Sequence, residues 1–319
     1  MTSQLAIVFD LDKTIGYFTQ IAIFMKGIEK YINRKLTKME LFKLFDLYPE
    51  IFRPEIMNIF KYLKKKKQQN KNLKVMIYTN NIGEKSWVYN IKEYIEKKIK
   101  YKIFDRVIAA WKVGPTVYEK CRSTHFKTVD ELRKCGKLKS SSKILFLDDQ
   151  RHPNMINKDV TYVFLYGYHQ DILFEKIINK FLDSKIGKLI HKKNAKDFEK
   201  FMMDFVQNDP LGYRYIEQDY DNSKFNNKYV MYSIKNFLEK NKILDNAREA
   251  KERQRGIFKS YDEEKKHIES RRRMKSKTKK LLNKRKNSKR RGKSIRRGKE
   301  ERSRTIKGRS LVGNVGVSS

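Results

Sequence analysis

Cysteine and long apolar runs are scarce in this chain of 319 residues. Its two cysteines, Cys121 and Cys135, are too few for a disulfide scaffold and lack the spacing of a metal site. We therefore expect free buried thiols in a reducing compartment. No apolar run approaches the roughly 20 residues of a membrane span, and the first one ends at Asp10, unlike a signal peptide. These absences predict a soluble intracellular protein without a membrane partner.

Acidic residues are also few: 37 stand against 75 basic ones, for a formal net charge of +38. More than half of this excess lies in residues 251–309, which have few apolar groups. We expect residues 251–319 to be a disordered basic tail, or helical only when bound. Such a tail predicts salt-dependent contacts with nucleic-acid phosphates, without base stacking, because no aromatic residue follows Tyr261. It also resembles a nuclear-import signal, so the nucleus is favoured, with the cytoplasm or a viral factory or virion as alternatives.

Apolar runs alternate with helical patterns over the first half of the chain, which predicts an α/β fold with a Rossmann-like parallel sheet flanked by helices. The helical patterns continue to about residue 250, without an internal repeat. The expected strands are residues 5–9, 73–78, 104–110, 143–147 and 160–166. We expect three units. Residues 1–170 form the sheet domain, which carries a small helical insert or minimal cap at 17–52. Residues 171–250 form a helical annex packed on the sheet, and residues 251–319 form the tail.

Three of these strands end in polar side chains. Asp10 and Asp12 follow the first strand, Thr79 follows the second, and the pair Asp148 and Asp149 follows the strand at 143–147. The carboxyl ends of parallel strands share one edge of the sheet, where ligands bind. Four carboxylates at one place repel one another unless a cation is present, and an all-oxygen ligand set favours Mg²⁺. The sequence therefore predicts an anionic metal site at this edge.

The same residues resemble a known family. Asp-Leu-Asp-Lys-Thr at 10–14, the strand-terminal Thr79, a lysine and Leu-Asp-Asp at 147–149 are similar to the haloacid dehalogenase-like (HAD) phosphatase superfamily. Arg53-Pro54 before a helix, Ile-Tyr-Thr-Asn at 77–80 and the segment 121–132 resemble its branch of C-terminal-domain protein phosphatases (FCP/SCP-like, NLI-interacting-factor-like). The resemblance covers about residues 1–170.

This resemblance implies roles for individual residues. Asp10 would be the nucleophile that forms an aspartyl-phosphate, and Asp12 the general acid and base. Thr79 would bind a phosphoryl oxygen, and Asn80 would assist it or cap the next helix. Mg²⁺ would be held by Asp10, the Asp12 carbonyl, Asp148 and Asp149. Lys127 fits the catalytic lysine best, because it follows a Cys-Arg pair and precedes a helix, among six candidates: Lys112, Lys127, Lys134, Lys137, Lys139 and Lys143.

The favoured function is hydrolysis of phosphoserine or phosphothreonine in a protein, near nucleic acid bound by the tail. The insert at 17–52 departs from the branch, which usually has β-hairpins there, and is too short for a full lid, which favours a macromolecular substrate. A polynucleotide-end phosphatase is the second hypothesis, and a nucleic-acid-binding protein with an inactive HAD-like scaffold is the third. We expect Thr14 to support the turn after the nucleophile. We expect three histidines to be ordinary loop or surface residues: His125, His152 and His169.

Overall fold

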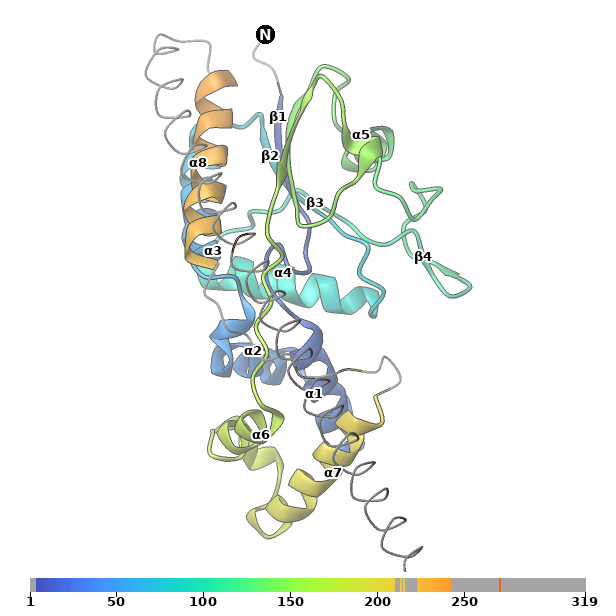
Figure 1. Cartoon of the computed structure of the whole chain (residues 1–319), viewed down its shortest axis with the longest axis vertical. Coiled ribbons are helices and arrows are strands. Elements are labelled where there is room, and N and C mark those ends of the chain that lie inside the picture. The colour runs from blue at the N-terminus through green and yellow to red at the C-terminus, as the bar shows by residue number, and fades with distance from the viewer. Residues whose placement is uncertain (1–3, 210–212, 214, 216–222, 242–269, 271–319) are drawn as a thin grey trace, which may run out of the picture. The chain divides into compact units, whose positions relative to one another are not determined.

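A five-stranded parallel sheet forms the centre of the protein, as expected (Figure 1). The computed structural model describes residues 4–209, 213, 215, 223–241 and 270. The strand order is β3-β2-β1-β6-β7, and every neighbouring pair is parallel. Four of the five strands match the expected ranges closely, and β3 is shorter than expected. The strands are β1 (Leu5–Phe9), β2 (Leu73–Tyr78), β3 (Arg106–Ile108), β6 (Lys143–Asp148) and β7 (Val160–Phe164).

Helices cover both faces of this sheet, which is why β1 is buried along its whole length. On one face, Val8 and Phe146 belong to a core cluster with Leu132 of α5 (Val129–Gly136). On the other, the ring of Phe9 meets Phe60 of α3 (Ile56–Gln69) edge to face, with 5.3 Å between centroids. The helix α4 (Lys85–Ile99) follows β2 and precedes β3. Burial of both faces explains the continuous apolar runs of the central strands.

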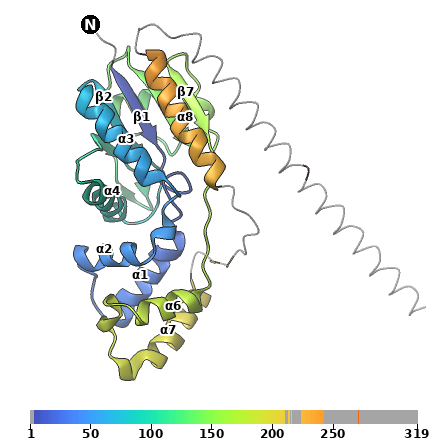
Figure 2. The ribbon, with the colours of Figure 1, turned by 90° about the vertical axis from the view of Figure 1, so that its left-hand side faces the viewer.

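A second helical layer combines two segments that are far apart in sequence. Figures 1 and 2 show α1 (Thr19–Tyr31) and α2 (Lys38–Leu47) beside α6 (Phe174–Leu182) and α7 (Ala195–Gln207). Tyr31 of α1 meets Phe198 of α7 at 5.0 Å, and Phe24 meets Phe181 of α6 at 5.4 Å. A Cβ at Gly27 would lie 2.5 Å from the Met202 side chain, so the two helices approach closely there. The insert at 17–52 and the start of the annex are thus one packed unit.

The remaining elements connect or extend these layers. The helix α8 (Ser223–Asn241) contacts β7, and Lys235 lies over the ring of Tyr62 in α3. The sequence did not predict the hairpin of β4 (Lys112–Val113) and β5 (Thr116–Val117), which turns at Gly114 with a positive φ of 55°. Within the part of the chain that the structure describes there are also four short 3-10 helices: η1 (Pro49–Ile51), η2 (Pro153–Met155), η3 (Ile186–Leu189) and η4 (Lys192–Asn194).

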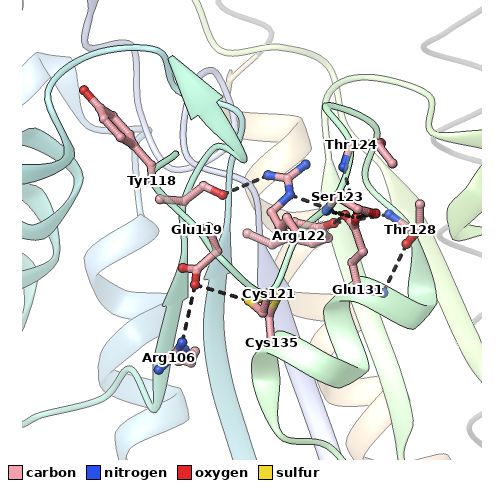
Figure 3. The surroundings of a disulfide bond; sticks show 12 residues. Arg106, Tyr118, Glu119, Cys121, Arg122, Ser123, Thr124, Thr128, Glu131 and Cys135 are labelled. Carbon is pink, nitrogen blue, oxygen red and sulfur yellow. Dashed lines mark hydrogen bonds and ion pairs between the residues drawn. A yellow bond between two sulfur atoms is a disulfide. The ribbon is translucent and has the colours of Figure 1, made fainter. Parts of the chain in front are cut away.

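The expectation of free thiols is wrong. Cys121 and Cys135 form a disulfide, shown in Figure 3, with their Cα atoms 5.4 Å apart. The loop after β5 folds back against the end of α5, which brings two cysteines 14 positions apart into bonding distance. Cysteine spacing alone could not show this return of the chain. The pairing removes the free thiols on which the expectation of a reducing compartment rested.

The basic tail at 251–319 lies outside the described residues, apart from Ser270. Its expected disorder and its expected contacts with nucleic acid therefore stay predictions. Among the helices that the structure describes, none combines the length and the apolar character that a membrane span requires.

Candidate active site

The carboxyl ends of β1 and β6 place three aspartates together. The backbone N–H of Asp10 donates to the carbonyl of Leu147 at 2.9 Å, which fixes the end of β1 beside Asp148. Asp10, Asp148 and Asp149 each offer a carboxylate oxygen, and these oxygens lie within 4.8 Å of one another. Asp10 and Asp148 are buried, and Asp149 is half-buried. The adjacency predicted from the strand ends is therefore present for these three residues.

Lys127 lies between two of these carboxylates. Its Nζ is 2.5 Å from Asp10 Oδ1 and 2.7 Å from Asp148 Oδ2, and the side chain is 2% exposed. The residue immediately precedes Thr128, whose hydroxyl caps α5 by accepting from the N–H of Glu131. Among the lysines considered from the sequence, this one reaches the aspartates, whereas Lys143 pairs with Asp159 on another edge.

Burial and mutual repulsion shift the acidity of the cluster. Burial raises the pKa of Asp10 to about 8, against the opposing charge of Lys127. Burial also raises the pKa of Asp149, and the charge of Asp148 adds to the effect. Asp148 behaves differently: burial opposes its ionisation, but contacts from His152 and Lys127 hold its pKa below the usual value. The pKa of Lys127 is raised, because Asp10 and Asp148 outweigh the effect of its burial. The surroundings therefore favour the charged forms of Asp148 and Lys127 and disfavour the ionised forms of Asp10 and Asp149.

Asp12 is hydrogen-bonded to Asn81, a residue that the sequence did not single out for the site. Its Oδ2 accepts from the side-chain amide of Asn81 at 2.7 Å. Burial raises the pKa of Asp12, against that hydrogen bond. Its carboxylate is not part of the three-aspartate cluster, which is compatible with a role separate from metal binding.

The end of β2 lies beside this arrangement. Thr79 is 1% exposed, its N–H donates to the carbonyl of Ile108, and its hydroxyl accepts from the N–H of Asn81. The side-chain amide of Asn80 donates instead to the carbonyl of His125 at 2.9 Å. Asn80 therefore holds the loop before Lys127, and phosphate binding by its side chain stays a prediction. The strand-end position of Asn81 was the available signal for its role, since it follows Thr79 by two residues.

The turn after Asp10 is held in place by Arg53. This side chain is almost fully buried and donates to the carbonyls of Thr14, Lys13 and Tyr166. Thr14 also directs its hydroxyl toward Asp149 Oδ1 at 3.5 Å, which fits the expected supporting role. The Arg-Pro pair noted in the sequence thus braces the segment between Asp10 and the helical layer.

His152 was expected to be an ordinary loop residue, and the structure corrects this. Its Nε2 lies 3.2 Å from Asp148 Oδ2, and the side chain is only 12% exposed. The residue follows Asp148 by four positions, in the segment between β6 and η2. His152 therefore belongs to the surroundings of the site and contributes to the low pKa of Asp148.

The donor set of the cluster fits a hard divalent cation. All three side chains offer carboxylate oxygens, and Mg²⁺ prefers such ligands while keeping several waters. The raised pKa values of Asp10 and Asp149 show that the metal-free cluster resists full ionisation. A bound cation would remove that resistance.

The shifted pKa of Asp10 predicts how stability depends on pH in the metal-free protein. Its folded pKa of about 8 lies above its ordinary value of 3.8. The neutral carboxyl therefore contributes stability that is complete below about pH 4 and is lost as the pH rises through 8, by up to about 1.4 kcal/mol per pH unit. Asp10→Asn should lack this loss.

The measurement is urea unfolding of wild type and Asp10→Asn in EDTA at several pH values between 5 and 8. We expect the variant to gain stability relative to wild type as the pH rises. A difference that stays constant over this range would contradict the raised pKa. Added Mg²⁺ should shrink the difference, because it stabilises the ionised carboxylate of the wild type only.

No protein-family model, curated protein or solved structure matches this chain.

Proposed function

We propose that this chain is a Mg²⁺-dependent phosphatase of the HAD-like type, with Asp10 as the nucleophile and phosphoserine or phosphothreonine proteins as substrates. The observation that supports it best is the convergence of Lys127 with Asp10, Asp148 and Asp149 at the carboxyl ends of two parallel strands. A buried ammonium amid carboxylates is suited to phosphoryl transfer, in which catalysis is mainly positioning and charge stabilisation. The sequence resemblance to the FCP/SCP-like branch supports the same chemistry.

In this proposal, Asp10 attacks phosphorus and forms an aspartyl-phosphate while the bond to the leaving oxygen breaks. Asp12 gives that oxygen its proton, and then accepts a proton from the water that hydrolyses the intermediate. Its raised pKa suits the first of these roles, and Asn81 fixes the direction of its carboxyl group. Lys127 stabilises negative charge on the transferring group, and Thr79 binds one of its oxygens.

Mg²⁺ would be held by Asp10, Asp148 and Asp149, and would supply the positive charge that lets a phosphate dianion approach a carboxylate. The Asp12 carbonyl is the further ligand that the resemblance implies. Lys127 alone provides one positive charge for this task. Three carboxylates carry more negative charge than one ammonium can neutralise, so a bound metal ion would balance the remainder.

The acid role of Asp12 leads to a prediction about leaving groups. A serine alkoxide needs a proton as it leaves, whereas para-nitrophenolate is stable without one. Asp12→Asn should therefore lower kcat on a phosphoserine peptide by about 10²–10⁴-fold. In the first step, in which the leaving group departs, the loss of rate on para-nitrophenyl phosphate should be at least about tenfold smaller than the loss on the peptide.

The two substrates should be compared with the same enzyme preparations, using Asp159→Asn as a matched surface control. Asp159 is a paired carboxylate directly before the amino end of β7, away from the aspartate cluster, and should tolerate the change. Equal losses in the rate of the first step, measured as release of the leaving group in a single turnover, would argue against Asp12 as the acid.

Substrate choice rests on the resemblance rather than on the length of the insert. The insert at 17–52 packs with α6 and α7, so the helical layer is larger than the insert alone.

A polynucleotide end is the second candidate substrate, favoured by the charge of residues 251–309. Turnover of a phosphoserine peptide should be compared with turnover of 5′- and 3′-phosphorylated oligonucleotides at two salt concentrations. Faster, salt-sensitive turnover of the oligonucleotides would support the second candidate.

A further inference from the structure

Arg122 joins three chain segments, one of which leads directly into Lys127. One terminal nitrogen, Nη1, donates to the carbonyls of Thr79 at 3.2 Å and Ala109 at 2.8 Å. The other, Nη2, donates to the carbonyls of His125 and Phe126, both at 3.3 Å. The first pair of carbonyls follows β2 and β3, and the second pair lies directly before Lys127. A single guanidinium therefore ties the lysine loop to the ends of two strands.

The plane of this guanidinium is itself fixed. It lies over the ring of Tyr78, with its central carbon 4.9 Å from the ring centroid, and Nε is 3.4 Å from Glu131 Oε2. Figure 3 shows Glu131 reaching back from α5 to the start of the same loop. Its Oε1 accepts from the N–H and hydroxyl of Ser123 and from the N–H of Thr124. The side chain of Arg122 has no exposure to solvent.

We infer that Arg122 is a positioning residue, which sets Lys127 Nζ between Asp10 and Asp148 by holding the carbonyls of the two residues before it. This inference rests on the proposed function. Two terminal nitrogens that each donate to two carbonyls require the fork of a guanidinium, because an ammonium is a single point of charge. A displacement of about 1 Å at a catalytic group is enough to lower a rate about 100-fold.

Two changes test this role while keeping the protein folded. Arg122→Lys retains the charge and loses the fork. Arg122→Met combined with Glu131→Gln removes both partners of the buried pair, so that neither charge is left alone. The control is Arg133→Met: this arginine of α5 also bonds two carbonyls, of Lys139 and Ser140, and pairs with Asp159, but its carbonyl partners follow the C-terminal end of the helix, whereas Lys127 precedes its N-terminal end.

The central experiment is a double-mutant cycle with Lys127→Met, read as kcat and KM for para-nitrophenyl phosphate with Mg²⁺. We expect the double change at 122 and 131 to lower kcat about 100-fold with little change in KM, and Arg122→Lys to lower it about tenfold. In the Lys127→Met background, the same changes should cost less than about threefold, because the group they position is already gone. Arg133→Met should leave kcat near the wild-type value. Circular dichroism and urea unfolding fix the folded fraction of each variant.

If the changes at Arg122 lowered kcat by the same factor with and without Lys127→Met, the inference would be overturned, while the proposed phosphatase function would stand. The inference would also be overturned if Arg122→Lys and the double variant Arg122→Met/Glu131→Gln both folded and kept the wild-type kcat. A wild-type protein without Mg²⁺-dependent turnover would overturn both the proposed function and this inference. The failures of the two claims are thus distinguishable in one set of measurements.

Discussion

Asp10→Asn should lower phosphatase turnover by at least about 10⁴-fold, because the neutral amide has no carboxylate oxygen with which to attack phosphorus. The change is close to isosteric and removes a carboxyl whose ionisation burial opposes. The variant should therefore fold at least as well as wild type. Its loss of activity would then reflect chemistry rather than structure.

The measurement is hydrolysis of para-nitrophenyl phosphate by wild type and variant, with Mg²⁺ and with EDTA. Wild type should also form a phosphoenzyme that survives acid quenching, and Asp10→Asn should not. Asp159→Asn is again the control. Substantial turnover by Asp10→Asn would rule out this nucleophile, and wild-type turnover that persists in EDTA would rule out the metal. Absence of any wild-type turnover, combined with tight binding to DNA, would favour the nucleic-acid-binding scaffold.

The second large effect concerns Lys127 and stability. Lys127→Met leaves Asp10 and Asp148 buried without their cation, which should cost about 3–5 kcal/mol of unfolding free energy in EDTA. The cost should be greater at pH 8 than at pH 6, because protonation of Asp10 relieves the repulsion at the lower pH. Mg²⁺ should restore much of the loss, since a cation bound by the aspartates supplies the missing charge.

Urea unfolding of wild type and Lys127→Met, with EDTA and with Mg²⁺ at both pH values, measures these effects. Lys143→Met is the matched control. Its ammonium pairs with Asp159 at 2.7 Å, but it is 43% exposed, so its loss should cost less than about 1 kcal/mol. Equal losses for the two lysines would show that the buried ion pairs do not hold the site together.

The sequence was sufficient for the sheet and for the convergence of Asp10 with Asp148 and Asp149. Apolar strands end where their polar side chains begin, and parallel strands share an edge, so adjacency follows from pattern alone. Lys127 was selected among the lysines because it precedes a predicted helix and follows a Cys-Arg pair, as the resemblance requires. These features depend on local order along the chain.

The residues that the sequence did not identify depend on how loops return in space. The choice of Asn81 over Asn80 as the partner of Asp12 is decided by the direction of one backbone turn after β2. His152 reaches Asp148 because the loop after β6 folds back over it. The pairing of Cys121 with Cys135 likewise follows from the return of a loop onto a helix. Propensity and periodicity carry no information about such returns.

The contact of α1 with α7 has a consequence for how this protein is made. Residues 19–31 leave the ribosome early, but their aromatic side chains find Phe181 and Phe198 only after about 160 more residues have been synthesised. A shortened chain that ends at residue 170 would leave Phe24 and Tyr31 uncovered beside the newly formed sheet. The helix α1 is thus translated early and covered late, so cutting the gene after β7 would leave this helix without the aromatic partners that α6 and α7 supply.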